Sequence, residues 1–138
     1  MMRRRCLLVL AAALVGGSIV APVASAARPR TLASYCSPSG DLCFGVIDRS
    51  GAVYLELSLA ARYFDRYRLC VRPPGPGASG AVRCGSFPVG RRGSGWGSSV
   101  KYARQFLLVG AGLYRVTWQL GAKPLGPTLR FRLPVRSQ

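Results

Sequence analysis

The chain contains no histidine and only four carboxylate side chains among its 138 residues. The absence of histidine removes the usual general base near neutral pH and excludes histidine-dependent catalytic triads. The four acids are Asp41, Asp48, Glu56 and Asp65. Asp48 falls in a predicted turn and Glu56 on a predicted solvent face, which does not match the paired carboxylates of a glycosidase. We therefore expect surface roles for the acids, a salt bridge from Asp65 to Arg62 or Arg66, and no enzymatic activity.

Metal and dinucleotide sites also lack their usual ligands in this sequence. Cys36 and Cys43 are separated by six residues, whereas zinc-binding cysteines are usually roughly two to four residues apart, often with histidine partners. The stretch Gly75–Gly80, GPGASG, fits the G-x-G-x-x-G pattern. Prolines surround and interrupt it, a predicted strand follows it in place of a helix, and no acidic side chain follows for a ribose. We expect no metal and no cofactor, and interpret GPGASG as a hairpin loop.

The one long apolar run lies at the N-terminus. Arg3–Arg5 leads into the apolar segment Cys6–Val20, and Ala24–Ala26 supplies an A-x-A cleavage pattern. This order is typical of a secretory signal peptide, predicted here over residues 1–26. The apolar segment is shorter than the roughly 20 residues that a membrane-spanning helix needs. We expect a single secreted domain over residues 27–138, extracellular or associated with the cell wall.

Residues 27–138 contain an even number of cysteines, namely Cys36, Cys43, Cys70 and Cys84. In an oxidising compartment this number predicts two disulfides. Four cysteines allow three pairings. Closeness in sequence favours Cys36 with Cys43 and Cys70 with Cys84, and the second of these bonds would clamp the stems of the GPGASG loop.

Apolar residues alternate with polar residues in short runs that glycine, proline and serine separate. This pattern predicts an antiparallel all-β domain, with residues 60–65 as an ambiguous short helical turn. Seven strands in about 100 residues favour a β-sandwich. The expected strands are Leu42–Asp48, Val53–Leu59, Arg66–Arg72, Ala81–Val89, Ser98–Phe106, Leu113–Gly121 and Pro127–Val135.

The segment Gly112–Trp118, GLYRVTW, resembles the G-x-Y-x-V-x-W strand of bacterial immunoglobulin-like domains. In those domains the tyrosine lies near the start of strand F and forms the tyrosine corner. The resemblance implies a seven-stranded, immunoglobulin-like or fibronectin type III-like sandwich in which Tyr114 and Trp118 have structural roles. Val116 occupies the position of the antibody cysteine, so the disulfide between the sheets is absent.

Two further segments resemble small secreted proteins of high-GC bacteria. Those proteins carry Y-C-S-P-S-G-D-x-C near the start and Y-R-L-C-V-R-P-P in the middle, here Tyr35–Cys43 and Tyr67–Pro74. The resemblance implies secretion and a β fold, and it implies no reaction chemistry.

Positive charge is concentrated after Asp65. The chain has a net charge of +16, and residues 66–138 contain 13 basic side chains and no carboxylate side chain. The immunoglobulin-like resemblance implies that the third, sixth and seventh predicted strands share one sheet, with Arg83 on a neighbouring strand. Six outward arginines would then share one solvent face: Arg66, Arg68, Arg72, Arg115, Arg130 and Arg132.

Three interpretations of these arginines follow. The first is a non-enzymatic protein that binds an anionic wall polymer, a lipid headgroup or an acidic protein, since guanidinium groups suit phosphate and carboxylate; nucleic acid is a less favoured partner. The second is a composition effect of a GC-rich genome on polar strand faces. The third is a small secreted protease inhibitor that presents Arg83 or Arg91 on the loops Arg72–Arg83 or Arg91–Trp96.

Overall fold

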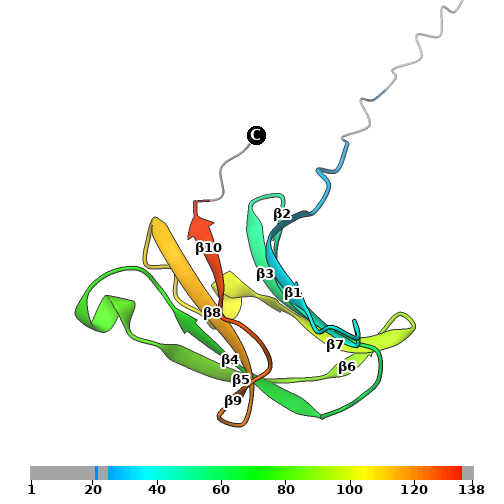
Figure 1. Cartoon of the computed structure of the whole chain (residues 1–138). Helices are drawn as coiled ribbons and strands as arrows, with labels where there is room; N and C mark the ends of the chain where they lie inside the picture. Colours follow the sequence, from blue (N-terminus) through cyan, green and yellow to red (C-terminus); the bar gives the residue numbers. More distant parts are fainter. Residues whose placement is uncertain (1–20, 22–24, 135–138) are drawn as a thin grey trace, which may run out of the picture.

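The computed structural model describes residue 21 and residues 25–134, so the predicted signal peptide lies almost wholly outside the described residues. Two antiparallel β-sheets face each other across one core (Figure 1). The first sheet has the order β1 (Arg30–Cys36), β2 (Leu42–Arg49), β3 (Ala52–Leu59), β7 (Gly95–Lys101) and β6 (Gly90–Arg92). The second has the order β10 (Leu129–Leu133), β8 (Gly112–Leu120), β4 (Arg66–Arg72) and β5 (Arg83–Pro88), and β9 (Lys123–Pro124) pairs with β8.

The all-β prediction is confirmed, but the strand number is wrong: the described residues form ten strands, not seven. The strands not predicted are β1, β6 and β9. The pairing of β1 with β2 shifts register between Thr31 and Ala33, which breaks the alternation that would reveal β1. The other two contain only three and two residues.

Two further local predictions are wrong. The expected strand Ser98–Phe106 begins earlier, at Gly95, and ends at Lys101, where the short helix α1 (Tyr102–Gln105) follows. Residues 60–65 contain no helical turn. Among the described residues, no helix is long and apolar enough to cross a membrane.

The core is built from the apolar faces of the alternating strands. Strand β3 buries every second side chain from Val53 to Leu59. Strand β4 buries Tyr67, Leu69 and Val71 on its core face, and Cys70 is also buried. Trp118 of β8 is fully buried, and its ring stacks on Phe44 of β2 with 4.5 Å between centroids. Since burial of one large apolar side chain stabilises a fold by about 1.5–3 kcal/mol, this shared core holds the two sheets together.

Two disulfides each join neighbouring strands, in the pairing that sequence proximity favours. Cys36–Cys43 links β1 to β2, and Cys70–Cys84 links β4 to β5. The second bond clamps the β4–β5 hairpin, whose connection contains only the short 3-10 turn η1 (Gly77–Gly80). The turn η1 covers the last four residues of the GPGASG stretch, so no α-helix begins at the last glycine. Two disulfides in a small domain are compatible with an extracellular protein.

Tyr114 fixes the connection that precedes β8. Its hydroxyl donates a hydrogen bond to the Gly110 carbonyl oxygen at 2.7 Å and accepts one from the Val109 N–H at 3.3 Å. The hydroxyl therefore holds the backbone four and five residues before it. The ring is fully buried and stacks on Phe131 of β10. The residue therefore couples the start of β8 both to the loop before it and to the core.

Candidate anion-binding site

The outer face of the second sheet carries the six predicted arginines. Along β4, exposed arginines alternate with buried Tyr67, Leu69 and Val71. The same alternation exposes the arginines of β8 and β10. Because successive side chains of a strand point to opposite faces, all of these arginines point away from the core. They are Arg66, Arg68, Arg72, Arg115, Arg130 and Arg132.

Three of these arginines lie directly opposite one another. Arg115 of β8 is opposite Arg72 of β4 on one side and Arg130 of β10 on the other. Directly opposed residues of an antiparallel pair have Cβ atoms about 4.5–5.5 Å apart, and like charges at such positions destabilise the sheet. We call Arg72, Arg115 and Arg130 the arginine ladder. Arg132 is the next outward residue of β10 and extends the ladder along that strand.

Arg66 and Arg68 lie apart from the ladder. The outward row between them and the ladder contains the Cys70–Cys84 disulfide and Thr117. Arg66 donates hydrogen bonds from Nε to Ser86 Oγ at 3.2 Å and from Nη2 to the Ser86 carbonyl oxygen at 3.1 Å. The six arginines therefore form two groups and not a single cluster. One is the ladder with the neighbouring Arg132, and the other is the pair Arg66 and Arg68.

Arg83 is not part of this face. It is opposite Val71, a core residue, so its position has the parity of the inner face. Its charge acts on the phenol of Tyr102, whose pKa burial raises well above the usual range and Arg83 lowers in part. Arg83 therefore lies on the strand next to β4, as expected, but it does not extend the outer arginine face.

A shallow hollow lies beside the ladder. It has a volume of about 320 Å³ and is lined by Cys70, Arg72, Val82, Arg115, Thr117, Gln119 and Thr128. The hydroxyls of Thr117 and Thr128 are 2.9 Å apart, and Gln119 Oε1 lies 3.4 Å from Cys70 Sγ. Hydroxyl and amide side chains therefore line the same hollow as two ladder arginines. Sequence reasoning missed Thr117 and Gln119, although they follow Arg115 at the same strand parity.

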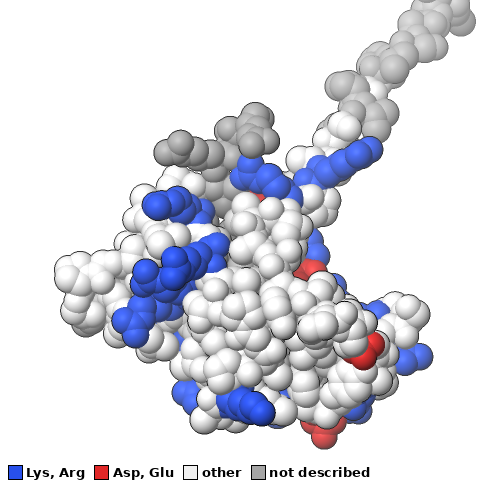
Figure 2. Space-filling view, in the orientation of Figure 1, with Lys and Arg blue, Asp and Glu red and all other residues white. Residues whose placement is uncertain are grey.

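The acids lie elsewhere and are mostly occupied. Three salt bridges occur among the described residues: Arg30–Asp48 at 3.7 Å, Arg49–Glu56, and the expected Arg62–Asp65 at 2.8 Å. All of these lie in the first half of the chain. Asp48 and Glu56 are partly buried, not simply solvated. Within the described residues, no ladder arginine has a carboxylate partner. Figure 2 shows Lys and Arg side chains gathered over β8 and β10, with Asp and Glu in isolated spots.

The loops considered for a protease inhibitor do not present their arginines at an apex. Arg83 lies within β5, and Arg91 lies within β6. The guanidinium carbons of Arg62 and Arg91 each lie 5.2 Å from the centroid of the Trp96 ring, which is half-buried. Trp96 of the β6–β7 hairpin therefore contacts Arg91 of the same hairpin and Arg62 of the β3–β4 connection.

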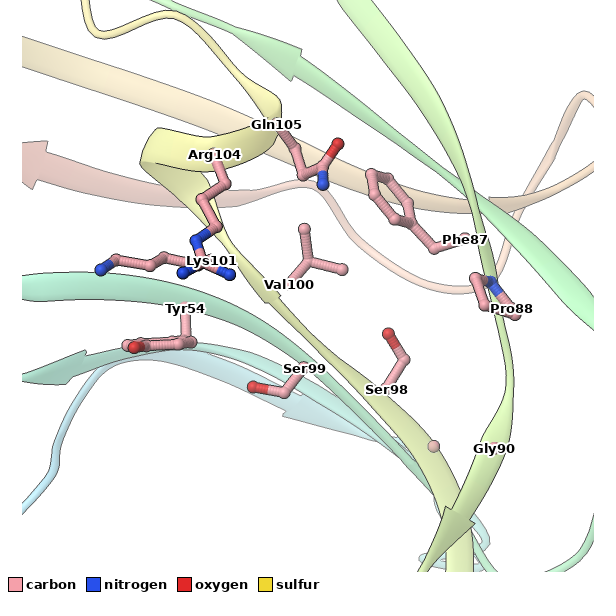
Figure 3. Close-up of a pocket in the computed structure, with 11 residues that line it drawn as sticks. Tyr54, Phe87, Pro88, Gly90, Ser98, Ser99, Val100, Lys101, Arg104 and Gln105 are labelled. Atoms are coloured by element: carbon pink, nitrogen blue, oxygen red, sulfur yellow. The ribbon is translucent and has the colours of Figure 1, made fainter.

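A second hollow of about 580 Å³ lies between β5 and β7. Figure 3 shows Phe87 projecting into it from β5, with Lys101 and Arg104 gathered at the opposite end near Tyr54. Its lining contains no carboxylate. Nearby, the Tyr67 hydroxyl lies 2.7 Å from Ser98 Oγ, and burial raises the pKa of Tyr67 to about 12. This phenol therefore remains protonated at neutral pH.

The described residues contain no group of three or more histidine, cysteine, aspartate or glutamate side chains placed to hold a metal ion. The chain matches no protein-family model, no curated protein and no solved structure at a significant level. The function is therefore inferred from the geometry and charge of the site.

Proposed function

We propose that this is a secreted, non-enzymatic protein that binds an anionic partner at the cell envelope or outside the cell through the arginine ladder. The observation that carries the proposal is the direct opposition of Arg72, Arg115 and Arg130, with no carboxylate partner among the described residues. Like charges at directly opposed positions destabilise the free protein. A phosphate or carboxylate bridging two guanidiniums offsets that repulsion and forms charge-assisted hydrogen bonds.

We also propose that the fold is of the immunoglobulin type. The order β2–β3–β7–β6 matches strands A-B-E-D, and the order β10–β8–β4–β5 matches G-F-C-C′. The hydrogen bonds of Tyr114 support the assignment of β8 as strand F. In this assignment β1 is an addition at the edge, and the ladder crosses strands C, F and G.

Secretion after removal of residues 1–26 is part of the same proposal. The basic, apolar and A-x-A order of the N-terminus and the two disulfides support it. Outside the cell, suitable partners are wall polymers, lipid headgroups and acidic proteins, which share phosphate or carboxylate groups.

The test is elution from heparin and from immobilised polyphosphate in a sodium chloride gradient. The ladder variant replaces Arg72, Arg115 and Arg130 with threonine. The control variant replaces Arg28, Arg92 and Lys123 with threonine, so it loses the same charge from exposed positions outside the outer arginine face. We expect the ladder variant to elute at clearly lower salt than wild type and control, because charge contacts determine the salt dependence. Equal elution of the two variants would show that only net charge matters.

An inhibition assay separates this proposal from the protease-inhibitor interpretation. We expect trypsin and subtilisin to keep full activity in the presence of the protein. Inhibition that disappears on replacement of Arg83 or Arg91 would support the inhibitor instead.

A further inference from the structure

Exposed apolar side chains gather at one end of the second sheet. Leu107 and Leu108 are 55% and 52% exposed in the connection from α1 to β8, and Val82 is 47% exposed in the β4–β5 connection. The β4–β5 connection meets the start of β8, because a Cβ added at Gly112, the first residue of β8, would lie 2.7 Å from Pro74 Cβ. These are three of the five large apolar side chains that are exposed among the described residues. All three precede strands that begin at the same end of the second sheet, since the starts of β5 and β8 both pair with the end of β4. We call Leu107, Leu108 and Val82 the apolar tip.

The apolar tip lies next to the arginine ladder. Strand β8 begins at Gly112, immediately after the loop that contains the two leucines, and Arg115 is three residues further along. At about 3.3 Å per residue the ladder lies roughly 10 Å from the start of the strand, within reach of arginine side chains. Val82 also lines the hollow that contains Arg72 and Arg115. Apolar and basic groups therefore share one end of the domain.

Negative charge at this end is neutralised. The turn at Gly51 reaches the same end, since Gly51 and Leu108 line a common hollow of about 550 Å³. Asp48 precedes that turn, and its side chain is only 14% exposed. It pairs with Arg30 and accepts a hydrogen bond from the Gly51 N–H at 2.8 Å. The carboxylate at this end is thus paired, and the ladder beside the apolar tip has no carboxylate partner among the described residues.

We propose that the anionic partner is the surface of an anionic lipid bilayer, with Leu107 and Leu108 inserted below the headgroups and the ladder bound to lipid phosphates. This inference rests on the proposed function, because it names the ligand of the same arginines. An anionic bilayer offers negative headgroups directly above an apolar layer, and apolar groups of peripheral proteins enter it by about 5–10 Å. A wall polymer supplies the negative charge and no apolar layer.

The first test is flotation with vesicles of phosphatidylcholine, alone or with about one-third phosphatidylglycerol. The protein is expected to bind only the vesicles that contain phosphatidylglycerol. The variant carrying Leu107→Ser and Leu108→Ser is expected to bind about 10- to 100-fold more weakly, from the half-exposed area of two leucines. The matched control is Leu120→Ser, because Leu120 is 44% exposed near the far end of β8. It is expected to bind as wild type does.

The second test measures insertion without removing apolar surface. A Leu107→Trp variant is expected to show added quenching by lipids brominated in their acyl chains, and a Leu120→Trp control is expected to show none. Near-ultraviolet circular dichroism checks that each variant is folded.

The outcomes separate this inference from the proposed function. Wild-type binding to heparin and polyphosphate, combined with unchanged vesicle binding of the leucine variant or no quenching at position 107, would overturn bilayer insertion and leave anion binding in place. Lack of wild-type binding to heparin, polyphosphate and anionic vesicles would overturn both.

Discussion

Replacement of Arg115, the middle residue of the ladder, with threonine is expected to stabilise the protein at low salt. Arg115 is directly opposed to two arginines, whereas Arg72 is opposed to one ladder arginine. Most surface substitutions change stability little or lower it. A gain in stability on loss of Arg115 would therefore report the repulsion that an anionic ligand relieves.

The magnitude follows from the spacing of the strands. The Cβ atoms of directly opposed residues lie about 4.5–5.5 Å apart. Two unit charges at about 5 Å repel by about 0.8 kcal/mol in water, which is an upper value because the long arginine side chains can diverge. Removal of Arg115 relieves two such pairs, so we expect a gain of up to about 1.6 kcal/mol. Arg72→Thr relieves one ladder pair and is expected to gain about half as much. At about 1 M salt the Debye length is near 3 Å, and both gains are expected to disappear.

The assay is urea unfolding of wild type, Arg115→Thr and Arg72→Thr at about 10 mM and about 1 M sodium chloride, with unchanged m-values as the control for a two-state comparison. Polyphosphate is expected to stabilise wild type more than Arg115→Thr, because a ligand stabilises the state that binds it. Destabilisation by Arg115→Thr at low salt, or an equal effect of the two substitutions, would refute the reasoning.

Three further predictions concern the scaffold and its pH range. Tyr114→Phe removes the hydrogen bond to Gly110 and is expected to lower the free energy of unfolding by about 1–3 kcal/mol in urea titrations; no loss would contradict the tyrosine corner. Replacement of Cys70 and Cys84 with alanine opens a loop closed over a sequence separation of 14 and is expected to cost about 3 kcal/mol by thermal unfolding. Tyr67 is 2% exposed, and burial raises its pKa to about 12. The contribution of the buried phenol to the free energy of unfolding is therefore complete below about pH 10 and falls by about 1.4 kcal/mol per pH unit toward pH 12. Chemical unfolding at stepped pH should show a smaller fall of the free energy of unfolding in the Tyr67→Phe control than in wild type.

The strands with clean alternation could be predicted from the sequence. Strand β3 shows the pattern over its whole length because one face is core and the other is solvent. Strand β1 could not be found this way, since its register shift mixes the two faces. The short helix α1 interrupts a run that continues the alternation of β7, and four residues are too few for a helical period to show. Neither error affects the sheet that carries the arginines.

The outward direction of the arginines could be predicted, but their grouping could not. Parity along one strand places Arg68 and Arg72 on the same face. Which residue lies opposite Arg72 depends on the hydrogen-bond register between β4 and β8, which 39 intervening residues separate from each other. A shift of two residues would keep the parity and dissolve the ladder. The face of Arg83 likewise depends on register, because it follows from the pairing of Arg83 with Val71.

The most direct test of the central claim is a titration of the isotope-labelled protein with short polyphosphate, followed by nuclear magnetic resonance of backbone amides and arginine side chains. We predict salt-sensitive shifts concentrated on Arg72, Arg115 and Arg130 and on neighbouring Thr117. The absence of saturable shifts at these residues, or shifts centred on Lys101 in the hollow between β5 and β7, would contradict the assignment of the arginine ladder as the binding site.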